Sequence, residues 1–288
     1  MEYIYHLAVL ITIYAGLALS LDLIVGYTGL LSVTHAAFYG FGAYSTAILM
    51  TRYGFNFFTS VAVGVVVSMT IALIIGYILS RFKDDYYALV SFGFNIIVFS
   101  VFLNWQNVTR GPLGIPGIGK PELFGYSFNT TVEFLVLSIV LMAMVYGTAR
   151  FVVQSSFGRV LKAIREDEKA IQVFGYNTNV FKLVIFVLSA GMAGIAGSLF
   201  ASYITFIDPS TFTLNESIFI LAMIILGGLA NIRGAVVGAV FLILLPEILR
   251  FVGFPTDIAA QMRQVVYGAL LIGLMLYRPQ GLLGEYKL

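Results

Sequence analysis

Cysteine is absent from the 288 residues of this chain, and charged residues are scarce. Without cysteine there is no disulfide framework, thiolate nucleophile or cysteine-based metal site. Only 10% of the residues are charged, whereas soluble domains carry roughly 25%. The formal net charge is +2, with no basic tail to attract nucleic acid. The metal-protease and hydrolase motifs HExxH and GxSxG are also missing, so we expect no catalytic residues, no metal and no cofactor.

Apolar residues dominate instead, at 60% of the chain with a mean hydropathy of +0.97. Several apolar runs, such as 61–80 and 131–150, reach the roughly 20 residues that are needed to cross the hydrocarbon of a bilayer. In lipid these runs must be helices, because open strands would leave backbone groups unpaired. The composition therefore predicts an all-α, polytopic membrane protein that forms a single transmembrane domain over residues 1–288.

Breaks in hydrophobicity divide the chain into about nine transmembrane or re-entrant helices, at residues 4–25, 30–50, 56–80, 86–104, 130–153, 183–204, 214–229, 234–252 and 262–277. One side of this topology holds Arg81, Lys83, Arg150, Arg159, Lys162, Arg165, Lys169, Lys182, Arg233, Arg278 and Lys287. The other side holds only Arg52, Arg110, Lys120, Arg250 and Arg263. Because basic residues favour the cytoplasmic side, we expect a multi-pass protein of the cell membrane with its N-terminus outside and its C-terminus in the cytoplasm.

The same topology is compatible with an inverted repeat. If the fifth helix is a connector, the first four and the last four helices run in opposite senses across the membrane. Each group has a glycine-rich weak point, Gly26-Tyr-Thr-Gly29 in the first and the stretch from Gly227 to Gly234 in the second. Interrupted helices at matching places often mark a transport pathway. The alternative is that both are ordinary helix ends joined by short turns.

Residues 154–182, here named the charged loop, concentrate charge between two apolar runs. Val160, Leu161 and Ile164 recur at helical spacing, which predicts an amphipathic helix, with a second helix after it that ends at Gly175. The polar faces mix basic residues with Glu166, Asp167 and Glu168, which anionic lipid would repel. A protein partner therefore suits this loop better than a lipid surface.

Several sequence blocks resemble one known family. The stretch from Gly158 to Ala170 (GRVLKAIREDEKA), followed by Gly175-Tyr-Asn177, is similar to the cytoplasmic coupling loop of permease subunits in branched-chain amino-acid ABC importers. The block from Gly26 to Tyr44 resembles the second-helix block of that family, and Arg278 to Gly284 (RPQGLLG) resembles its C-terminal signature. Leu226 to Leu229 also fits, and Thr109 to Gly114 fits less closely. The likeness covers nearly the whole chain and is to the M-type permease subunit.

The resemblance implies a transport subunit rather than an enzyme, importing branched-chain amino acids or similar small polar solutes. Its implied partners are a related H-type permease subunit in a heterodimer, two ABC ATPase subunits that hydrolyse ATP, and an extracytoplasmic substrate-binding protein, within membrane lipid. The charged loop would dock on an ATPase, with apolar residues anchored in a groove and charges setting the register. The residues so assigned are Arg159, Leu161, Ile164, Arg165, Glu166, Asp167, Glu168, Ala170 and Gly175.

Polar residues at the expected membrane depth are candidates for the translocation path, because charge there is costly and needs a reason. We assign Ser32, His35, Asn95 and Glu216 to this path, with Asp22, Thr34 and Asn215 as further residues of similar type. The simpler interpretation has the two carboxylates at helix ends, capping or reaching water, and His35 hydrogen-bonded within the bundle.

Other functions remain open at this stage. Related permeases import urea, short amides or other amino acids, and an ion-coupled secondary transporter would need an intramembrane cluster of carboxylates, for which Asp22 and Glu216 alone are too few. A purely structural scaffold is disfavoured by the ordered charged loop. Residues from Gly114 to Lys120 match the start of a phosphate-binding P-loop, but Pro121 stands where Ser or Thr would hold Mg²⁺, so we expect no nucleotide site.

Overall fold

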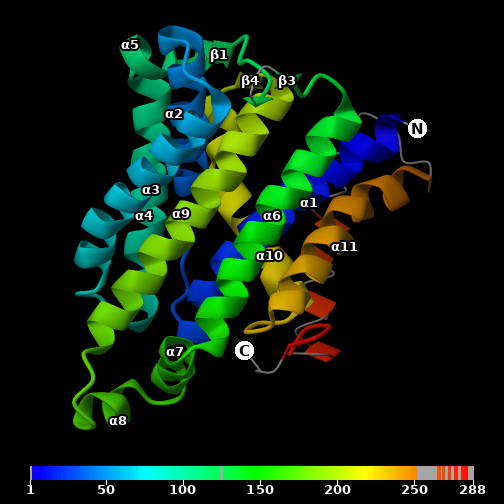
Figure 1. Ribbon diagram of the computed structural model, residues 1–288. Coiled ribbons are helices and arrows are strands. Elements are labelled where there is room, and N and C mark those ends of the chain that lie inside the picture. Colours follow the sequence, from blue (N-terminus) through cyan, green and yellow to red (C-terminus); the bar gives the residue numbers. More distant parts are fainter. Residues whose placement is uncertain are drawn as a thin grey trace.

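A computed structural model describes residues 2–123 and 126–251, with short pieces between 265 and 284. The longer helices are α1 (Glu2–Thr28), α2 (His35–Tyr53), α3 (Phe57–Leu79), α4 (Asp84–Asn104), α6 (Thr131–Gln154), α9 (Thr178–Ile204), α10 (Leu214–Gly227) and α11 (Ile232–Phe251). Two shorter helices, α7 (Ser156–Glu166) and α8 (Glu168–Val173), lie in the charged loop. These two form one end of the bundle, which we name the loop end (Figure 1).

The opposite end, named the strand end, carries short elements between the helices. They are α5 (Gln106–Thr109), η1 (Gly111–Leu113), β1 (Ile115–Pro116), β2 (Glu122–Leu123), β3 (Tyr126–Ser127), β4 (Phe206–Ile207) and η2 (Pro209–Phe212). β1 pairs antiparallel with β4, placing Ile115 opposite Ile207, and β2 pairs antiparallel with β3. The P-loop-like stretch lies here, and the Lys120 Nζ donates a hydrogen bond to the Asn129 carbonyl at 2.6 Å.

The predicted helical membrane fold is confirmed, but the count of nine helices is not. Five helices, α1, α3, α4, α6 and α9, are long and apolar enough to cross a membrane. α10 and α11 form a pair bent by 119°, either a broken span or a re-entrant loop, so the described part of the chain has up to six spans. Half of the residues of the ninth predicted helix, 262–277, lie outside the described part of the chain.

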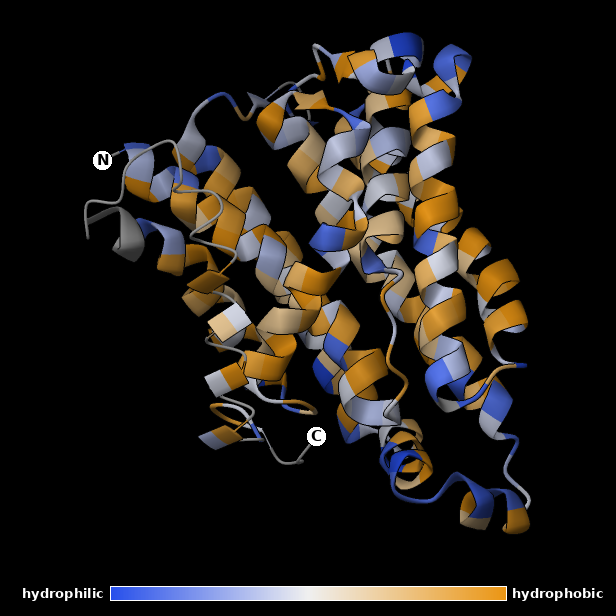
Figure 2. Cartoon of the chain, turned by 180° about the vertical axis from the view of Figure 1, so that it is seen from behind, coloured by the Kyte–Doolittle hydropathy of each residue, from blue (hydrophilic) through white to orange (hydrophobic). Residues whose placement is uncertain are grey.

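α2 is less apolar than these spans, and other helices surround it. Most of its residues from His35 to Ala47 are buried, and α3 and α9 cover it. α1 is similarly enclosed over its second half, by α6, α9, α10 and α11. The polar side chains of α2, such as Thr46, are therefore enclosed by protein. The outer faces of α3, α4 and α6 carry large exposed apolar side chains. Figure 2 shows that hydrophobic residues, drawn in orange, dominate the long helices.

Small residues allow α2, α3 and α9 to approach closely. A Cβ atom on Gly42 of α2 would lie 2.2 Å from the Gly194 carbonyl oxygen of α9, and one on Gly197 would lie 2.0 Å from the Tyr39 carbonyl oxygen. Between these backbones, the Thr46 hydroxyl donates to the Ser198 hydroxyl at 2.8 Å. Close backbone contact and polar bonds of this kind are how helices associate in lipid, where no hydrophobic effect drives them together.

We predict that Gly42→Ala destabilises the protein by roughly 1–3 kcal/mol, because the added methyl group must push α2 away from α9. The matched control is Gly147→Ala on α6, where an added Cβ atom meets nothing within 4 Å. Thermal unfolding of both variants in detergent measures the difference. An equal melting temperature for Gly42→Ala and the wild type would contradict this account of the helix packing.

Candidate translocation path and docking loop

A non-helical segment, residues 29–34, joins α1 to α2. α1 ends at Thr28, and Gly29 adopts a φ of 73°, in the left-handed region that glycine tolerates. The chain then runs back along the bundle before α2 begins at His35 (Figure 1). The sequence placed the start of this helix at residue 30. The helix starts later because α4 holds the backbone of Val33 on both sides: the Ser91 Oγ accepts from its amide at 3.2 Å, and Asn95 Nδ2 donates to its carbonyl at 3.0 Å.

Asn95 is the centre of a buried polar cluster beside this segment. Its Nδ2 also donates to Ser217 Oγ of α10 at 2.8 Å, and Ser217 Oγ accepts from the Ala36 amide at 2.9 Å. The Ser32 and Thr34 hydroxyls lie 2.9 Å apart, and both side chains are fully buried. Asn95 Oδ1 has no hydrogen-bond partner among the described residues. The cluster thus joins α4, α10 and segment 29–34. Of the four predicted path residues it contains Asn95, and Ser32 directly precedes Val33 in the same segment.

His35 makes a separate set of contacts. Its Nε2 lies 3.1 Å from the Ser20 hydroxyl of α1 and 3.1 Å from the Ser189 hydroxyl of α9, and its ring is fully buried with an edge-on contact to Phe38. Ser189 lies near the middle of α9, so His35 and the start of α2 lie deep in the bundle. Its Nδ1 has no hydrogen-bond partner among the described residues. These contacts match the simpler interpretation, in which His35 is hydrogen-bonded within the bundle.

The two intramembrane carboxylates also have separate partners. Glu216, in the first turn of α10, accepts a 2.5 Å hydrogen bond from the Tyr14 hydroxyl of α1 and is partly buried. Asp22 of α1 is fully buried, and its Oδ1 accepts from the Ala230 amide at 2.9 Å, in the turn between α10 and α11. Asn215, the other polar residue of this turn of α10, is exposed. The carboxylates therefore form no common site.

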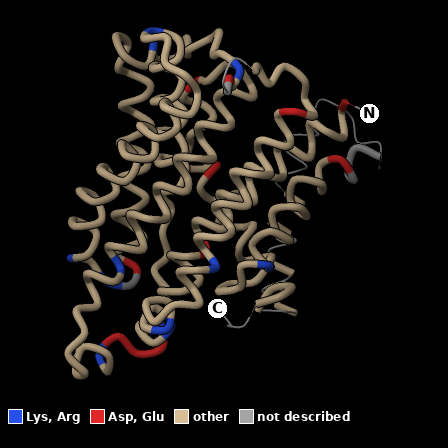
Figure 3. The backbone as a smooth tube through the Cα atoms, viewed as in Figure 1, with Lys and Arg blue, Asp and Glu red and all other residues tan. Residues whose placement is uncertain are grey.

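The charged loop contains the two helices that the sequence predicts. Ser155, Asp167 and Asn177 cap α7, α8 and α9, each accepting a hydrogen bond from the backbone amide three residues later. Gly175 follows α8 with a φ of 87°, as expected of a glycine at a helix C-terminus. Charged side chains lie mainly along this loop and at the helix ends (Figure 3).

Several of the predicted docking residues contact the helical bundle of this chain and are not available at the surface. Leu161 and Ile164 are buried in the bundle, and the Arg165 guanidinium donates to the Gly26 carbonyl of α1. Ala170 is partly buried, while the exposed members of the predicted set are Arg159, Glu166, Asp167 and Gly175. Two apolar residues outside that set are also highly exposed, Val173 at 85% and Phe174 at 77%.

Glu168 anchors α8 to the start of α9. Its Oε2 lies 2.6 Å from the Lys182 Nζ, and its Oε1 accepts from the Thr178 hydroxyl at 2.8 Å. Burial raises the pKa of Glu168, but the hydrogen bonds and positive charge of Lys182, with the Thr178 hydroxyl, outweigh it and hold this pKa below its ordinary value of 4.5. Glu168 is therefore ionised and paired at neutral pH.

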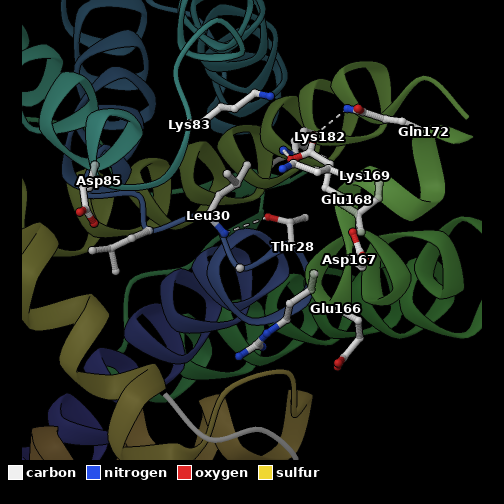
Figure 4. A pocket seen from close by; sticks show the side chains of 15 residues that line it. Thr28, Leu30, Lys83, Asp85, Glu166, Asp167, Glu168, Lys169, Gln172 and Lys182 are labelled. Carbon is white, nitrogen blue, oxygen red and sulfur yellow. Dashed lines mark hydrogen bonds and ion pairs between the residues drawn. The ribbon is translucent and has the colours of Figure 1, made fainter.

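A pocket of about 470 Å³ opens at the loop end, between segment 29–34, α4 and the charged loop (Figure 4). Its walls carry charges of both signs and a few apolar groups. They are formed by Thr28, Gly29, Leu30, Leu31, Lys83, Asp85, Ala88, Ile164, Arg165, Glu166, Asp167, Glu168, Lys169, Gln172 and Lys182. The volume is within the range of small-molecule sites. Because Leu30 and Leu31 line it, the pocket leads directly to the segment that carries Ser32.

Sequence reasoning did not identify the partners of Asp22 or the roles of Ser91 and Ser217. Asp22 and Ala230 are separated by 208 residues, and Asn95 and Ser217 by 122. Serines within apolar runs are common, and nothing in the local sequence distinguishes these from others. Only the paired breaks near Gly26 and Gly227 indicated that these regions were special.

Comparison with known proteins supports the resemblance found in the sequence. Residues 3–275 match the family described as branched-chain amino acid transport system / permease component. One relative is the high-affinity branched-chain amino acid transport system permease protein LivM of Escherichia coli (strain K12). It is 33% identical over an alignment 300 residues long, gaps included, that covers 96% of this chain and 69% of LivM. The corresponding permease protein LivH of the same organism is 28% identical over 294 residues, covering 94% of this chain and 91% of LivH.

A more distant relative is the probable branched-chain amino acid transport permease protein LivM of Methanocaldococcus jannaschii, 23% identical over 245 residues, or 78% of this chain and 70% of that protein. No solved structure matches the chain. With a family match over most of its length and apolar helices able to cross a membrane, the chain belongs to the family of permease components of branched-chain amino acid transport systems.

Proposed function

We propose that this chain is the M-type permease of an ABC importer that moves branched-chain amino acids into the cell. It would pair with an H-type permease, draw on two separate ATPase subunits and receive solute from an extracytoplasmic binding protein. Similarity to both LivM and LivH supports the pairing, and the greater identity to LivM supports the M-type assignment. The unequal division of Lys and Arg supports a cytoplasmic loop end, with the N-terminus outside and the C-terminus inside.

The irregular backbone of segment 29–34 is the main support for a translocation path through this part of the protein. This segment forms neither helix nor sheet, buries Ser32 and Thr34 in the bundle, and leaves the Leu31 side chain 43% exposed. Irregular backbone in contact with lipid does not occur, but it is tolerated against protein or beside water. The exposed face of segment 29–34 would therefore meet the partner permease, and the path would run between the two subunits. Ser32 and Asn95 would lie on the bundle side of this segment. The charged pocket would be the cytoplasmic exit.

An ion-coupled transporter is the second candidate, and the carboxylates argue against it. Asp22 bonds the Ala230 amide, while Glu216 bonds the Tyr14 hydroxyl. Coupling ions are usually held by several oxygen ligands at a broken helix. Among the described residues, no group of three or more His, Asp or Glu side chains is placed to hold a metal ion.

Docking on an ATPase would use the exposed tip of the charged loop. Val173 and Phe174 lie at the C-terminal end of α8 with their side chains in solvent, and exposed Glu166 and Asp167 lie at its N-terminal end. Apolar anchors surrounded by polar residues are typical of a protein interface. Leu161 and Ile164, buried against the chain, would instead transmit the force of docking to the bundle.

The absence of cysteine makes the proposed path testable by labelling. We predict that Leu31→Cys in the assembled transporter reacts with a membrane-impermeant methanethiosulfonate about ten-fold faster than Val66→Cys, because only a hydrated thiol ionises. Val66 is the control, being 61% exposed on the outer face of α3. The rates are measured with and without ATP. If Leu31→Cys is as unreactive as Val66→Cys in both conditions, segment 29–34 does not line the path.

If α8 docks on the ATPase, a charge at its exposed apolar end should weaken ATPase binding. Phe174→Asp should reduce co-purification of the ATPase subunits by about ten-fold, because it places a charge in an apolar contact. Tyr53→Asp, at the strand end and 67% exposed, is the control and should retain them. Retention of the ATPases by Phe174→Asp would show that α8 is not the docking element.

Anchorage of α8 by Glu168 should depend on pH. Because the pKa of Glu168 is lowered in the folded protein, its contribution is complete above about pH 4.5 and is lost as the pH falls through the lowered pKa. The pair with Lys182 is partly exposed and contributes up to about 1 kcal/mol, so Glu168→Gln should raise amide exchange in α8 at neutral pH measurably, by up to about five-fold. Glu166→Gln is the control. Unchanged exchange in Glu168→Gln would contradict the anchoring role.

A further inference from the structure

Arg165 belongs to the charged loop, yet its side chain is directed into the bundle. Its guanidinium donates to the Gly26 carbonyl, near the end of α1. The side-chain stem lies against Gly29, where a Cβ atom would be 3.2 Å from the Arg165 Cγ. α7 is thereby attached to the point at which α1 ends and segment 29–34 begins.

Asp22 faces the same place from one turn earlier on α1. Its carboxylate is close enough to interact electrostatically with Arg165, while its Oδ1 accepts from the Ala230 amide. Its Oδ2 has no hydrogen-bond partner among the described residues. Gly26 must be glycine, because a Cβ atom there would lie 2.1 Å from Asp22 Oδ1 and 2.6 Å from the Ala230 nitrogen.

Ala230 lies in the second break, the turn between α10 and α11. Gly228 and Ala230 both have positive φ values, 108° and 59°. The C-terminal signature joins the same turn, with the Leu282 amide donating to the Leu226 carbonyl and the Leu283 amide to the Gly227 carbonyl, each at 2.9 Å. The two interruptions of the helical bundle and the charged loop therefore meet at one buried carboxylate.

We propose that Arg165 and Asp22 are positioning residues that transmit movement of the charged loop to both breaks, and that neither contacts the ATPase. This inference rests on the proposed function. A buried charge separated from its partners is costly, so α7, the end of α1 and the α10–α11 turn must move together. A force on the loop would thus reach segment 29–34 and the turn at the same time.

The test uses the complete transporter in liposomes, with the two permeases, the ATPases and the binding protein. Uptake of L-leucine and ATP hydrolysis are measured on the same vesicles. For Arg165→Gln and for Asp22→Asn, we expect the ATP consumed per leucine to rise about five-fold or more, while ATPase co-purification stays within about two-fold of wild type. Asp22→Asn keeps the shape of the side chain and leaves the loop surface untouched.

Three comparisons make this outcome specific. Arg150→Gln, an exposed arginine at the loop end of α6, should leave the ratio unchanged. The double variant should be no worse than either single one, because both substitutions break the same connection. Arg165→Lys, which keeps the charge but loses the planar fork, should recover part of the coupling.

Other outcomes would overturn the proposal. Loss of ATPase binding in Arg165→Gln would make Arg165 a docking residue, and effects that add in the double variant would show two independent roles. If ATP hydrolysis and leucine uptake fall in the same proportion in both Arg165→Gln and Asp22→Asn, then neither residue couples hydrolysis to uptake. Failure of the wild-type complex to take up leucine with ATP would refute the proposed function itself, and is seen before any variant is made.

Discussion

In lipid, every backbone group and every charge must find its partner inside the protein, and this constraint shapes the whole chain. Most of the chain meets it with uninterrupted helices. Where the helix stops, side chains from other helices replace the missing bonds: Ser91 and Asn95 bind the backbone of Val33, and Asp22 binds that of Ala230. The positions of the interruptions are therefore set by buried polar residues on α1 and α4.

The same constraint explains which parts of the structure the sequence could predict. Helices in lipid follow from apolar length alone, so the class of fold, the first break and the end of the second loop helix were all accessible from local pattern. Gly175, for example, was correctly placed at the end of the second loop helix. The start of α2 was misplaced by five residues because its limit is set by α4, some sixty residues away.

Contacts over long separations also decide which residues of the site act together. Asn95 binds the backbone of segment 29–34 next to Ser32, whereas His35 and Glu216 have other partners, a difference that only the tertiary structure shows. The amphipathic pattern of α7 identified an apolar face at Leu161 and Ile164 correctly. It could not show whether that face meets a partner or the chain itself, since both surfaces are equally apolar.

The enclosure of α2 has a consequence for biosynthesis. This helix is less apolar than the spans around it, and its His35 and Thr46 bind Ser189 and Ser198 of α9, which are synthesised about 150 residues later. When α2 first leaves the ribosome, its polar groups have no such partners, and lipid is a poor substitute. The central helix of the bundle must therefore wait near the insertion machinery, or beside α1 and α3, until α9 arrives to complete its surroundings.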